Sequence, residues 1–253
     1  QITDALIKEA VSGQEDDRWE SLEAQDGDRY LLVGGEGNMG RWFQDYLRQG
    51  GASVRTVDEK PTADHQTIPS LQDYDCVLLT TPVHVTPQIL SEIRRRDPDV
   101  VVADITSVKA PVEDELKQLR DNGVPVTSFH PMFDADSNTL NRKNVIIASL
   151  NCSRADQRIR ALFQETAAEV TTVPFDDHDR IITTTLALPH IVNLVFGDVL
   201  KDDEQSFSEL NRLAGTTFQE QAHAAKEVFS ENSAVYHAIQ HYAGSAYLFT
   251  AIR

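Results

Sequence analysis

The fold is decided by residues 33–40, which read Val-Gly-Gly-Glu-Gly-Asn-Met-Gly. The segment holds three glycines in the spacing G-x-G-x-x-G, namely Gly35, Gly37 and Gly40. The apolar run Tyr30–Val33 predicts a strand before them, and Asn38–Gln49 has a helical pattern that a Gly-Gly pair ends. The glycines therefore occupy a strand-to-helix turn, the context that this spacing requires to bind a dinucleotide. A purely structural turn is the alternative.

The three glycines have different predicted roles toward a dinucleotide. Gly35 permits the tight turn, Gly37 lets the backbone approach a pyrophosphate, and Gly40 lets the helix pack closely on the strand. The free amides and the dipole at the start of the helix, where Asn38 and Met39 lie, attract phosphates. We therefore expect all five residues to bind the cofactor.

An acidic residue follows the loop at the spacing that nucleotide-binding units use. Asp58 comes directly after the second predicted strand, Ala52–Val57, where a carboxylate can bond the ribose hydroxyls. Its charge would repel a 2′-phosphate, so the sequence favours NAD over NADP. The nearby cations Lys60 and Arg41 leave NADP open.

Predicted strands and helices alternate from residue 30 to residue 174. Further strands are predicted at Cys76–Thr80, Val100–Ile105, Val124–Phe129, Val145–Ala148 and Val170–Val173, with helices at 86–96, 111–121 and 153–168. Strands separated by helices imply a parallel, doubly wound sheet of the Rossmann type. His130 follows the fifth of these strands, and we expect Pro131 to end it.

After Phe175 the sequence predicts long helices at 176–200, at 205–228 and from 231 to the end. The predicted fold class is therefore α/β, with the Rossmann-type sheet followed by an all-α C-terminal domain. We expect an N-terminal helix and linker at 1–29, a NAD-binding domain at 30–174 and a helical domain at 175–253.

The charge balance is strongly acidic, with 40 Asp and Glu against 23 Lys and Arg and a formal net charge of −17. Such a field disfavours binding to nucleic acid or to an anionic membrane. An acid-rich, lysine-poor composition resembles that of proteins from salt-loving organisms, and an acidic protein of ordinary surroundings is the alternative. We expect a small-molecule substrate as the partner.

Composition also limits the location and the cofactors. No apolar run is expected to reach the length of a membrane span, and no signal peptide pattern is present. The two cysteines, Cys76 and Cys152, cannot form a disulfide framework or a four-ligand metal site. The sequence therefore predicts a cytoplasmic protein with no metal centre.

Polar side chains follow three further predicted strands. Thr81 and Pro82 follow the third strand, Ser107 and Lys109 the fourth, and His130 the fifth. Because the carboxyl ends of parallel strands share one edge of a sheet, we expect these residues near the nicotinamide. His130 is the candidate acid or base, Ser107 would orient it, and Lys109 would offset the charge of a bound anion. A structural histidine, loop capping and a surface charge are the alternatives.

Two further histidines lie in the helical part. His190 is flanked by apolar residues and by Pro189, which predicts a helix kink. It is either a buried histidine bonded to a backbone carbonyl or a ligand contact. His178 lies among acidic residues and is expected to be solvated.

These motifs together resemble those of the prephenate dehydrogenase family. Five blocks of this chain match the family in order: V-G-G-x-G-x-M-G-R-x-F at 33–43, P-[IV]-H-V-T at 82–86, D-x-x-S-V-K at 104–109, H-P-M-F-x-x-D-S at 130–137, and [ED]-H-D with a later histidine at 177–190. They cover about two thirds of the chain, roughly residues 30–195.

The resemblance implies NAD-dependent oxidative decarboxylation of prephenate to 4-hydroxyphenylpyruvate in tyrosine biosynthesis. It implies that His130 accepts the proton of the ring hydroxyl as hydride leaves the ring, and that loss of carbon dioxide makes the ring aromatic. Ser107 would hold His130 and contact substrate, Lys109 would support the site, and His190 would line the substrate pocket. The helical domain would complete the cleft and pair two subunits in a homodimer.

One departure from the family leaves alternatives open. The family places an arginine in the third helical segment to hold a substrate carboxylate, and Glu227 stands at that position in an ungapped alignment. A carboxylate cannot replace that arginine, so Lys226 or Arg212 serves instead or the substrate binds differently. An arogenate dehydrogenase and a non-catalytic NAD-binding regulatory module are the alternative functions.

Overall fold

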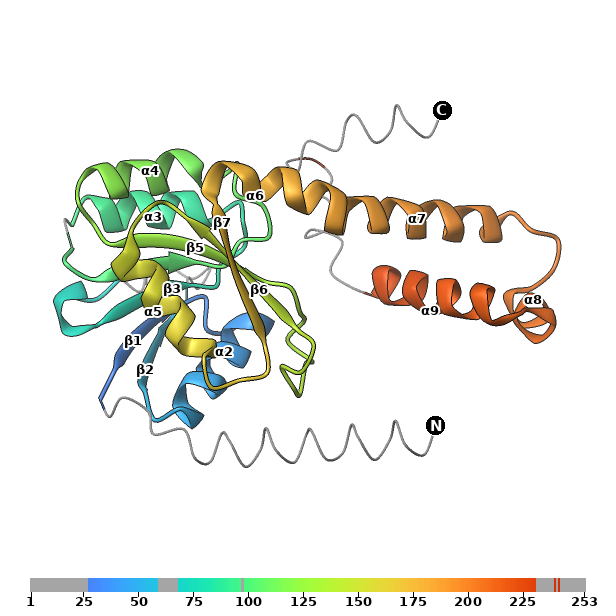
Figure 1. Ribbon diagram of the computed structural model, residues 1–253, viewed down its shortest axis with the longest axis horizontal. Coiled ribbons are helices and arrows are strands. Elements are labelled where there is room, and N and C mark those ends of the chain that lie inside the picture. The colour runs from blue at the N-terminus through green and yellow to red at the C-terminus, as the bar shows by residue number, and fades with distance from the viewer. Residues whose placement is uncertain (1–26, 59–67, 97, 231–238, 240, 242–253) are drawn as a thin grey trace. The chain divides into compact units, whose positions relative to one another are not determined.

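The computed structural model describes residues 27–58, 68–96, 98–230, 239 and 241 (Figure 1). Three predicted parts lie outside these described residues: the N-terminal helix with nearly all of its linker, Lys60, and all but residues 239 and 241 of the helix from residue 231 to the end. The chain divides into two compact units between Asp177 and His178.

The first unit is built on a seven-stranded sheet with the order β2-β1-β3-β4-β5-β6-β7. Its strands are β1 (Arg29–Val33), β2 (Ser53–Val57), β3 (Cys76–Leu79), β4 (Val101–Asp104), β5 (Val126–Pro131), β6 (Asn144–Ser149) and β7 (Glu169–Pro174). The first five strands are mutually parallel. Because β2 and β3 flank β1 on opposite sides, the strand order reverses at β1, and ligands bind at such a point in doubly wound sheets.

Helices cover both faces of this sheet (Figure 1). They are α2 (Asn38–Gln49), α3 (Thr86–Arg94), α4 (Glu113–Asp121) and α5 (Ser153–Phe163), with one 3₁₀ turn at Leu71–Asp73. Leu90 of α3 and Leu116 of α4 pack in one hydrophobic cluster. Phe43 of α2 and Ile159 of α5 pack in the other. Two cores on opposite faces confirm the predicted doubly wound α/β fold.

The sheet is not wholly parallel, which corrects one expectation. Strand β6 was predicted at nearly its observed position, but it runs antiparallel to β5. Residues 132–143, which connect the two strands, contain no helix, so the chain turns back directly instead of crossing over. Strand β7 then runs parallel to β6, because α5 supplies the crossover.

Strand β5 continues through His130 and Pro131, whereas we expected Pro131 to end it. Pro131 pairs with Val145, and the Met132 amide donates to the Asn144 carbonyl at 2.9 Å. Since alternate residues of an antiparallel pair direct their amides to opposite sides, the amide that proline lacks would face away from β6. On that side β4 has already ended, so no ladder hydrogen bond is lost.

The second unit is helical in its described part, as the sequence predicted for this region. Helix α6 (Phe175–Ile182) enters it, followed by a π-helical turn (Thr183–Ala187), α7 (Leu188–Lys201), α8 (Phe207–Leu213) and α9 (Thr216–Ser230). Pro189 lies in the first turn of α7. The π-helical turn directly before it changes the backbone hydrogen-bond pattern where proline lacks a donor.

Among the described residues, one helical stretch is long and apolar enough to cross a membrane by length and composition, Phe175–Lys201, with a mean hydropathy of 1.3. This corrects the expectation that no run reaches that length. The charged residues of the stretch lie near its two ends, which leaves the segment 181–197 without Asp, Glu, Lys or Arg. One such helix is weak evidence for a membrane, because core helices of soluble proteins pass the same test.

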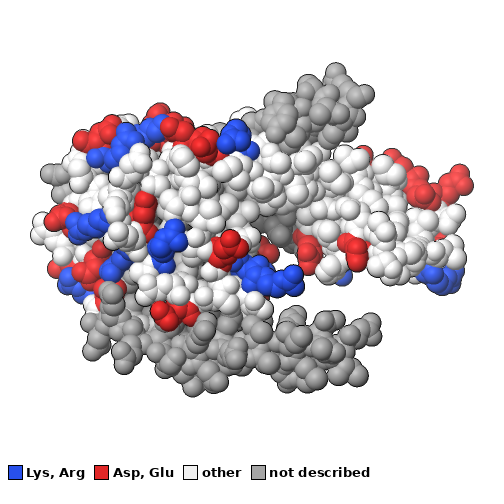
Figure 2. Space-filling model, in the orientation of Figure 1, with Lys and Arg blue, Asp and Glu red and all other residues white. Residues whose placement is uncertain are grey.

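Many of the few basic side chains lie beside acidic ones on the surface of the first unit (Figure 2). Lys117 contacts Glu113 at 2.6 Å and Asp176 at 2.8 Å, and Arg154 contacts Asp99 at 2.8 Å. Exposed pairs of this kind contribute little to stability, about 0–1 kcal/mol each.

Candidate active site

The glycine loop leaves no space for side chains at the point where the strand order reverses. A Cβ atom on Gly40 would lie 2.0 Å from the Gly34 carbonyl oxygen, and one on Gly35 would lie 2.6 Å from Cγ2 of Thr56. Gly34 itself has φ of +93°, in the left-handed region, and a Cβ there would lie 2.9 Å from the Thr80 carbonyl. The loop after β1 thus packs against the ends of β2 and β3, as a dinucleotide cradle requires.

The N-terminus of helix α2 is suited to bind an anion. Its N-cap is Gly37, which has no side chain to bond the first amides, and its first turn contains no acidic residue. The side chain of Asn38 accepts a hydrogen bond from the Arg41 guanidinium at 3.0 Å. The first-turn amides, which include that of Met39, have no acceptor within the helix, so they are available to phosphate oxygens.

Asp58 lies directly after β2 and is held against the glycine loop. Its Oδ1 atom accepts a hydrogen bond from the Glu36 amide at 2.9 Å. A Cβ on Gly35 would lie 3.6 Å from the Oδ2 atom, so that carboxylate oxygen is also beside the loop. The predicted loop and the predicted acidic residue are therefore brought together, and the residues present fit the ribose and pyrophosphate of a dinucleotide.

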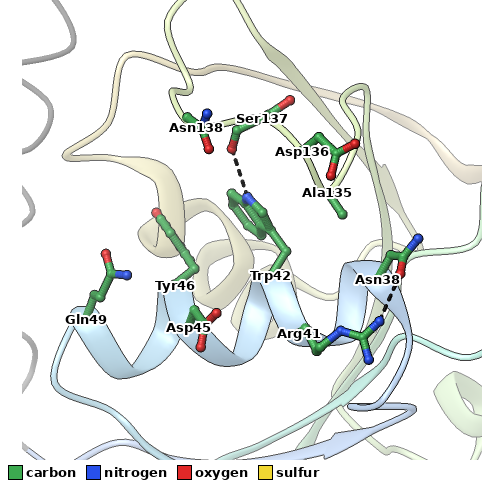
Figure 3. Close-up of a pocket in the computed structure, with 10 residues that line it drawn as sticks. All are labelled: Asn38, Arg41, Trp42, Asp45, Tyr46, Gln49, Ala135, Asp136, Ser137 and Asn138. Carbon is green, nitrogen blue, oxygen red and sulfur yellow. Dashed lines mark hydrogen bonds between the residues drawn. The ribbon is translucent and has the colours of Figure 1, made fainter. Parts of the chain in front are cut away.

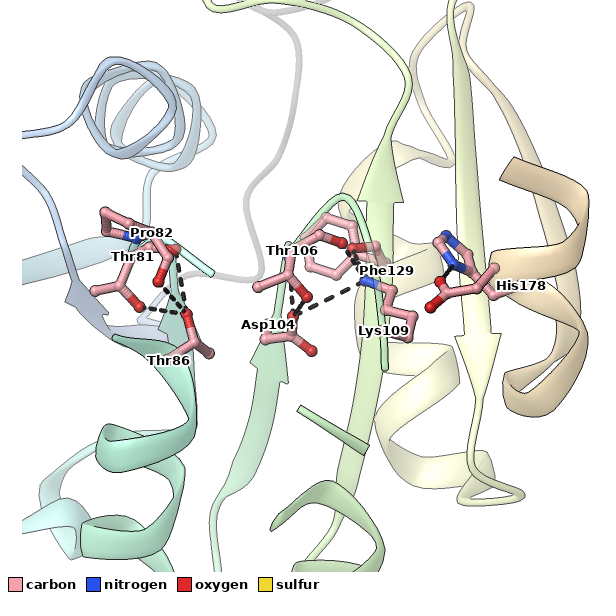
Figure 4. A network of polar contacts seen from close by, with 9 residues as sticks. Thr81, Pro82, Thr86, Asp104, Thr106, Lys109, Phe129 and His178 are labelled. Atoms are coloured by element: carbon pink, nitrogen blue, oxygen red, sulfur yellow. Dashed lines mark hydrogen bonds and ion pairs between the residues drawn. The ribbon is translucent and has the colours of Figure 1, made fainter. Parts of the chain in front are cut away.

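The end of β3 braces the loop from the other side. The Thr80 hydroxyl lies within hydrogen-bond distance of two carbonyl oxygens of the β1 turn, 3.1 Å from Val33 and 3.0 Å from Gly34. The hydroxyls of Thr81 and Thr86 lie 2.9 Å apart, and Thr86 also donates to the Pro82 carbonyl at 3.0 Å (Figure 4). The predicted residues Thr81 and Pro82 thus lie in a turn fixed to the start of α3.

Lys109 is buried in a polar network at the ends of β4 and β5, which excludes the alternative of a surface charge. Its Nζ atom donates to the Thr106 carbonyl at 2.6 Å and to the Phe129 carbonyl at 3.0 Å (Figure 4). The Asp104 carboxylate lies 3.9 Å from the same Nζ atom. Because Phe129 directly precedes His130, the ammonium group ties the turn after β4 to the strand that carries the histidine.

Sequence reasoning assigned no role to Asp104 and Thr106, which complete this network. Both are buried, and Oδ2 of Asp104 accepts hydrogen bonds from the Thr106 amide at 2.8 Å and the Thr106 hydroxyl at 2.5 Å. The Asp-x-Thr spacing was the available signal, since an aspartate at a strand end often bonds the backbone two residues later. These contacts shape the turn from which Lys109 projects.

His130 is buried at the carboxyl end of β5, opposite Ile146 of β6. Ser107 is half-buried in the turn after β4. The orienting role predicted for Ser107 toward His130 stays a prediction. His130 shares the sheet edge with the glycine loop and Asp58, because β1, β2 and β5 are parallel strands of one sheet.

The prediction that His178 is solvated is wrong. His178 is buried in α6, and its Nδ1 atom lies 2.7 Å from Oδ1 of Asp179 (Figure 4). Phe175 and Ile182, which are also buried, stand three residues before it and four residues after it. The three residues therefore share one face of the helix, and the neighbouring acidic residues lie on the other faces.

His190 is buried in α7, and its burial lowers the pKa of the imidazole below its ordinary value of 6.5. Asn193, one turn later, is also buried, and its Oδ1 atom accepts a hydrogen bond from the Gln221 side chain of α9 at 2.6 Å. The second unit therefore carries a buried polar face on α7. The substrate contact predicted for His190 stays a prediction.

The residues discussed in place of the family's arginine are all exposed. Glu227 lies in the last turns of α9, where one carboxylate oxygen is 3.3 Å from Nε2 of His223. Lys226 beside it and Arg212 of α8 are also exposed. The substrate contact predicted for Lys226 or Arg212 stays a prediction.

The cysteines and the possible metal ligands remain to be described. Cys76 and Cys152 are both free thiols, and burial raises the pKa of Cys76 to about 12. In the part of the chain that the structure describes, no group of three or more His, Cys, Asp or Glu residues could hold a metal ion.

The fold and the site define a doubly wound α/β protein that contains a cradle for a nucleotide. Residues 49–170 match the family model described as the nucleotide-binding domain of prephenate dehydrogenase. The chain is therefore similar to the nucleotide-binding domain of the prephenate dehydrogenase family over residues 49–170, which supports the resemblance of the motifs.

Two curated relatives support this assignment. The chain is 27% identical over 207 residues to the T-protein of Enterobacter agglomerans, a match that covers 81% of this chain and 54% of that protein. It is 23% identical over 225 residues to a probable arogenate/prephenate dehydrogenase of Methanocaldococcus jannaschii, with 83% and 50% covered. The chain thus spans about half the length of the curated relatives it matches.

A solved structure shows the same fold. The prephenate dehydrogenase of Aquifex aeolicus, in complex with hydroxyphenyl propionate and NAD⁺, superimposes with a TM-score of 0.65 at 19% identity. The superposition covers 89% of this chain and 87% of that chain.

Proposed function

We propose that this chain is an NAD-dependent dehydrogenase that oxidises and decarboxylates prephenate to 4-hydroxyphenylpyruvate. One observation carries the proposal: a buried histidine, His130, stands at the same sheet edge as a glycine loop that has no room for side chains. A nucleotide cradle and a proton acceptor at one edge are what hydride transfer from a hydroxyl-bearing ring requires.

The cradle residues fit NAD. Gly35 and Gly40 let the loop pack tightly on β2 and on the β1 turn, Gly37 lets the backbone approach a pyrophosphate, and Asp58 offers its carboxylate to the ribose hydroxyls. When bound, NAD supplies the hydride acceptor. The negative charge of Asp58 beside the loop supports NAD over NADP, since a 2′-phosphate would lie next to that carboxylate. The NAD⁺ complex of the Aquifex aeolicus enzyme is consistent with this choice.

His130 takes the proton. Its imidazole bonds the ring hydroxyl of the substrate and removes the hydroxyl proton as the ring loses hydride. Departure of the carboxylate as carbon dioxide leaves its electron pair in the ring, which becomes aromatic and so drives the step. The proton held by His130 then returns to the ring oxygen and gives the hydroxyl of the product. Lys109 acts on the backbone beside His130, because its ammonium group bonds the Phe129 carbonyl. Ser107 is assigned to orient the imidazole and contact the substrate, and His190 to contact the substrate.

Arogenate is the alternative substrate, since it differs from prephenate by an amino group in place of the side-chain keto group. The names of the relatives include prephenate, arogenate and 4-amino-4-deoxyprephenate, the last for a Streptomyces pristinaespiralis protein that is 25% identical over 187 residues. These substrates share the ring carboxylate and differ in the groups that the protein would have to distinguish.

A non-catalytic, NAD-binding regulatory module is the rival from another class. Glu227 favours it, because a carboxylate cannot hold a substrate carboxylate as an arginine does. The buried His130 and the Lys109 network beside it favour the enzyme, because a module without catalysis has no need of them.

We also propose that the protein forms a homodimer through its helical domain in the cytoplasm. Helix α7 exposes several large apolar side chains, Val192, Leu194, Val195 and Val199. Apolar side chains gathered on one helix support association with another protein surface.

The test is an assay of NADH formation with prephenate, arogenate and 4-amino-4-deoxyprephenate, each at low and at molar salt. We expect turnover of prephenate that exceeds turnover of the other two. Binding of NAD without turnover of any of the three would instead support the regulatory module.

A further inference from the structure

Helix α2 contacts the chain on both sides of His130. The ring of Phe43 meets that of Phe129 edge-on, with centroids 5.8 Å apart at 87°. The preceding residue of the helix, Trp42, meets Phe133 with centroids 5.0 Å apart at 57°. Two adjacent residues of α2 therefore hold the residue before the histidine and the residue three positions after it.

Trp42 also makes a directional contact with the segment that follows. Its indole Nε1 donates a hydrogen bond to the Ser137 carbonyl at 3.1 Å (Figure 3). The indole ring stacks on Tyr46, with centroids 4.9 Å apart and planes at 14°. Because the ring is packed on Tyr46 and Phe133, its N–H points in one fixed direction.

A pocket of about 400 Å³ separates much of α2 from the segment at 135–138 (Figure 3). Asn38, Arg41, Asp45 and Gln49 line it from the helix. Trp42 reaches across this space to the Ser137 carbonyl, as Figure 3 shows. The hydrogen bond from the indole therefore joins the segment 135–138 to helix α2 beside the pocket.

We propose that Trp42 is a positioning residue that fixes His130 relative to the nucleotide loop. Helix α2 begins at Gly37 and Asn38 in that loop, and Trp42 joins the same helix to Phe133 and Ser137. A nucleotide held at the start of α2 and the chain that carries His130 thus share one rigid element. This inference rests on the proposed function and adds the residue that links nucleotide binding at the glycine loop to proton removal by His130.

The test compares Trp42→Phe with the matched control Tyr46→Phe in the full chain. Trp42→Phe keeps an aromatic ring and loses the donor to Ser137. Tyr46→Phe loses a hydrogen bond of the same aromatic cluster, from its hydroxyl to the Leu162 carbonyl of α5, and keeps the ring that stacks on Trp42. For Trp42→Phe we expect kcat with prephenate to fall roughly tenfold, because small misplacements of a catalytic group are costly. The dissociation constant for NAD should stay within about twofold, since the loop itself is intact.

For Tyr46→Phe we expect a lower melting temperature with kcat unchanged. Equal kcat for Trp42→Phe and wild type, or an equal fall of kcat in both variants, would overturn the proposal, because it would leave Trp42 a purely structural role.

Hydrogen exchange provides a readout that does not depend on turnover. The Ser137 amide donates to the Asp134 carbonyl at 3.0 Å, and we expect it to exchange faster in Trp42→Phe than in Tyr46→Phe. If wild type bound NAD and turned over no substrate, the proposed function would fail. The exchange experiment would then still test whether Trp42 holds the segment at Ser137. Equal exchange of the Ser137 amide in the two variants would show that it does not.

Discussion

The Nζ atom of Lys109 lies 3.0 Å from the carbonyl oxygen of Phe129, the residue directly before His130. The same atom lies 2.6 Å from the Thr106 carbonyl, directly before Ser107. One buried cation thus joins the backbone at the two positions that precede the proposed catalytic residues. Because both of these hydrogen bonds go to backbone carbonyls, they hold the two strand ends together.

Lys109→Met should destabilise the first unit. The substitution removes two charge-assisted hydrogen bonds and leaves the buried Asp104 carboxylate without its cation, which together cost about 3 kcal/mol. Urea denaturation would measure the change in the free energy of unfolding. Lys117→Met is the matched control, because Lys117 pairs with Glu113 and Asp176 at the surface, where the loss is about 1 kcal/mol or less. Equal losses in the two variants would contradict the role given to Lys109.

Gly40→Ala should abolish tight nucleotide binding. The added Cβ would lie 2.0 Å from the Gly34 carbonyl oxygen, so the loop or the helix must move. We expect the dissociation constant for NAD, measured by calorimetry, to rise at least roughly tenfold. Gly215→Ala is the control, because no atom lies within 4 Å of the Cβ that it adds. Retained affinity in Gly40→Ala would show that the cradle does not hold the pyrophosphate.

Substitutions of Asp58 separate its charge from its contact with the loop. Asp58→Ala removes both the charge and the acceptor for the Glu36 amide, whereas Asp58→Asn keeps an oxygen for that amide. We expect both to reduce the preference for NAD over NADP, by roughly tenfold in the ratio of kcat/KM. Only Asp58→Ala should also weaken binding of both cofactors. An unaltered preference in both variants would remove Asp58 from cofactor selection.

His190 should make the protein less stable in mild acid. Burial lowers the pKa of its imidazole below 6.5, so as the pH falls below 6.5 the unfolded chain binds the proton first. The contribution to stability is therefore present above pH 6.5 and is lost as the pH falls through the lower pKa of the folded state. Urea denaturation between about pH 7 and pH 5 should show a smaller loss for His190→Gln than for wild type. Equal losses would mean that His190 does not titrate in this way.

Local chemistry made the nucleotide loop predictable. Helix α2 has the predicted bounds, because a glycine loop precedes it and a Gly-Gly pair follows it. The position of Asp58 beside the loop also followed from its spacing. The direction of β6 could not be read from its own residues, since it depends on whether the chain before it forms a helix.

Long-range contacts account for what the sequence did not show. Lys109 was predicted to lie at the site, with a surface charge as the alternative, but its burial could not be predicted because it bonds backbone carbonyls, one of them on another strand. His178 looked solvated because its neighbours in sequence are acidic, whereas burial follows the helix face that it shares with Phe175 and Ile182. The Trp42 contact with Ser137 joins residues 95 positions apart, beyond the reach of any local pattern.

The central claim is that His130 removes the substrate proton at the edge where the nucleotide binds. The most direct test is the rate of NADH formation from prephenate by His130→Asn, measured beside the dissociation constant for NAD. We predict that the rate falls by roughly 10²- to 10⁴-fold while the NAD affinity is nearly unchanged. A variant that forms NADH as fast as wild type would contradict the account.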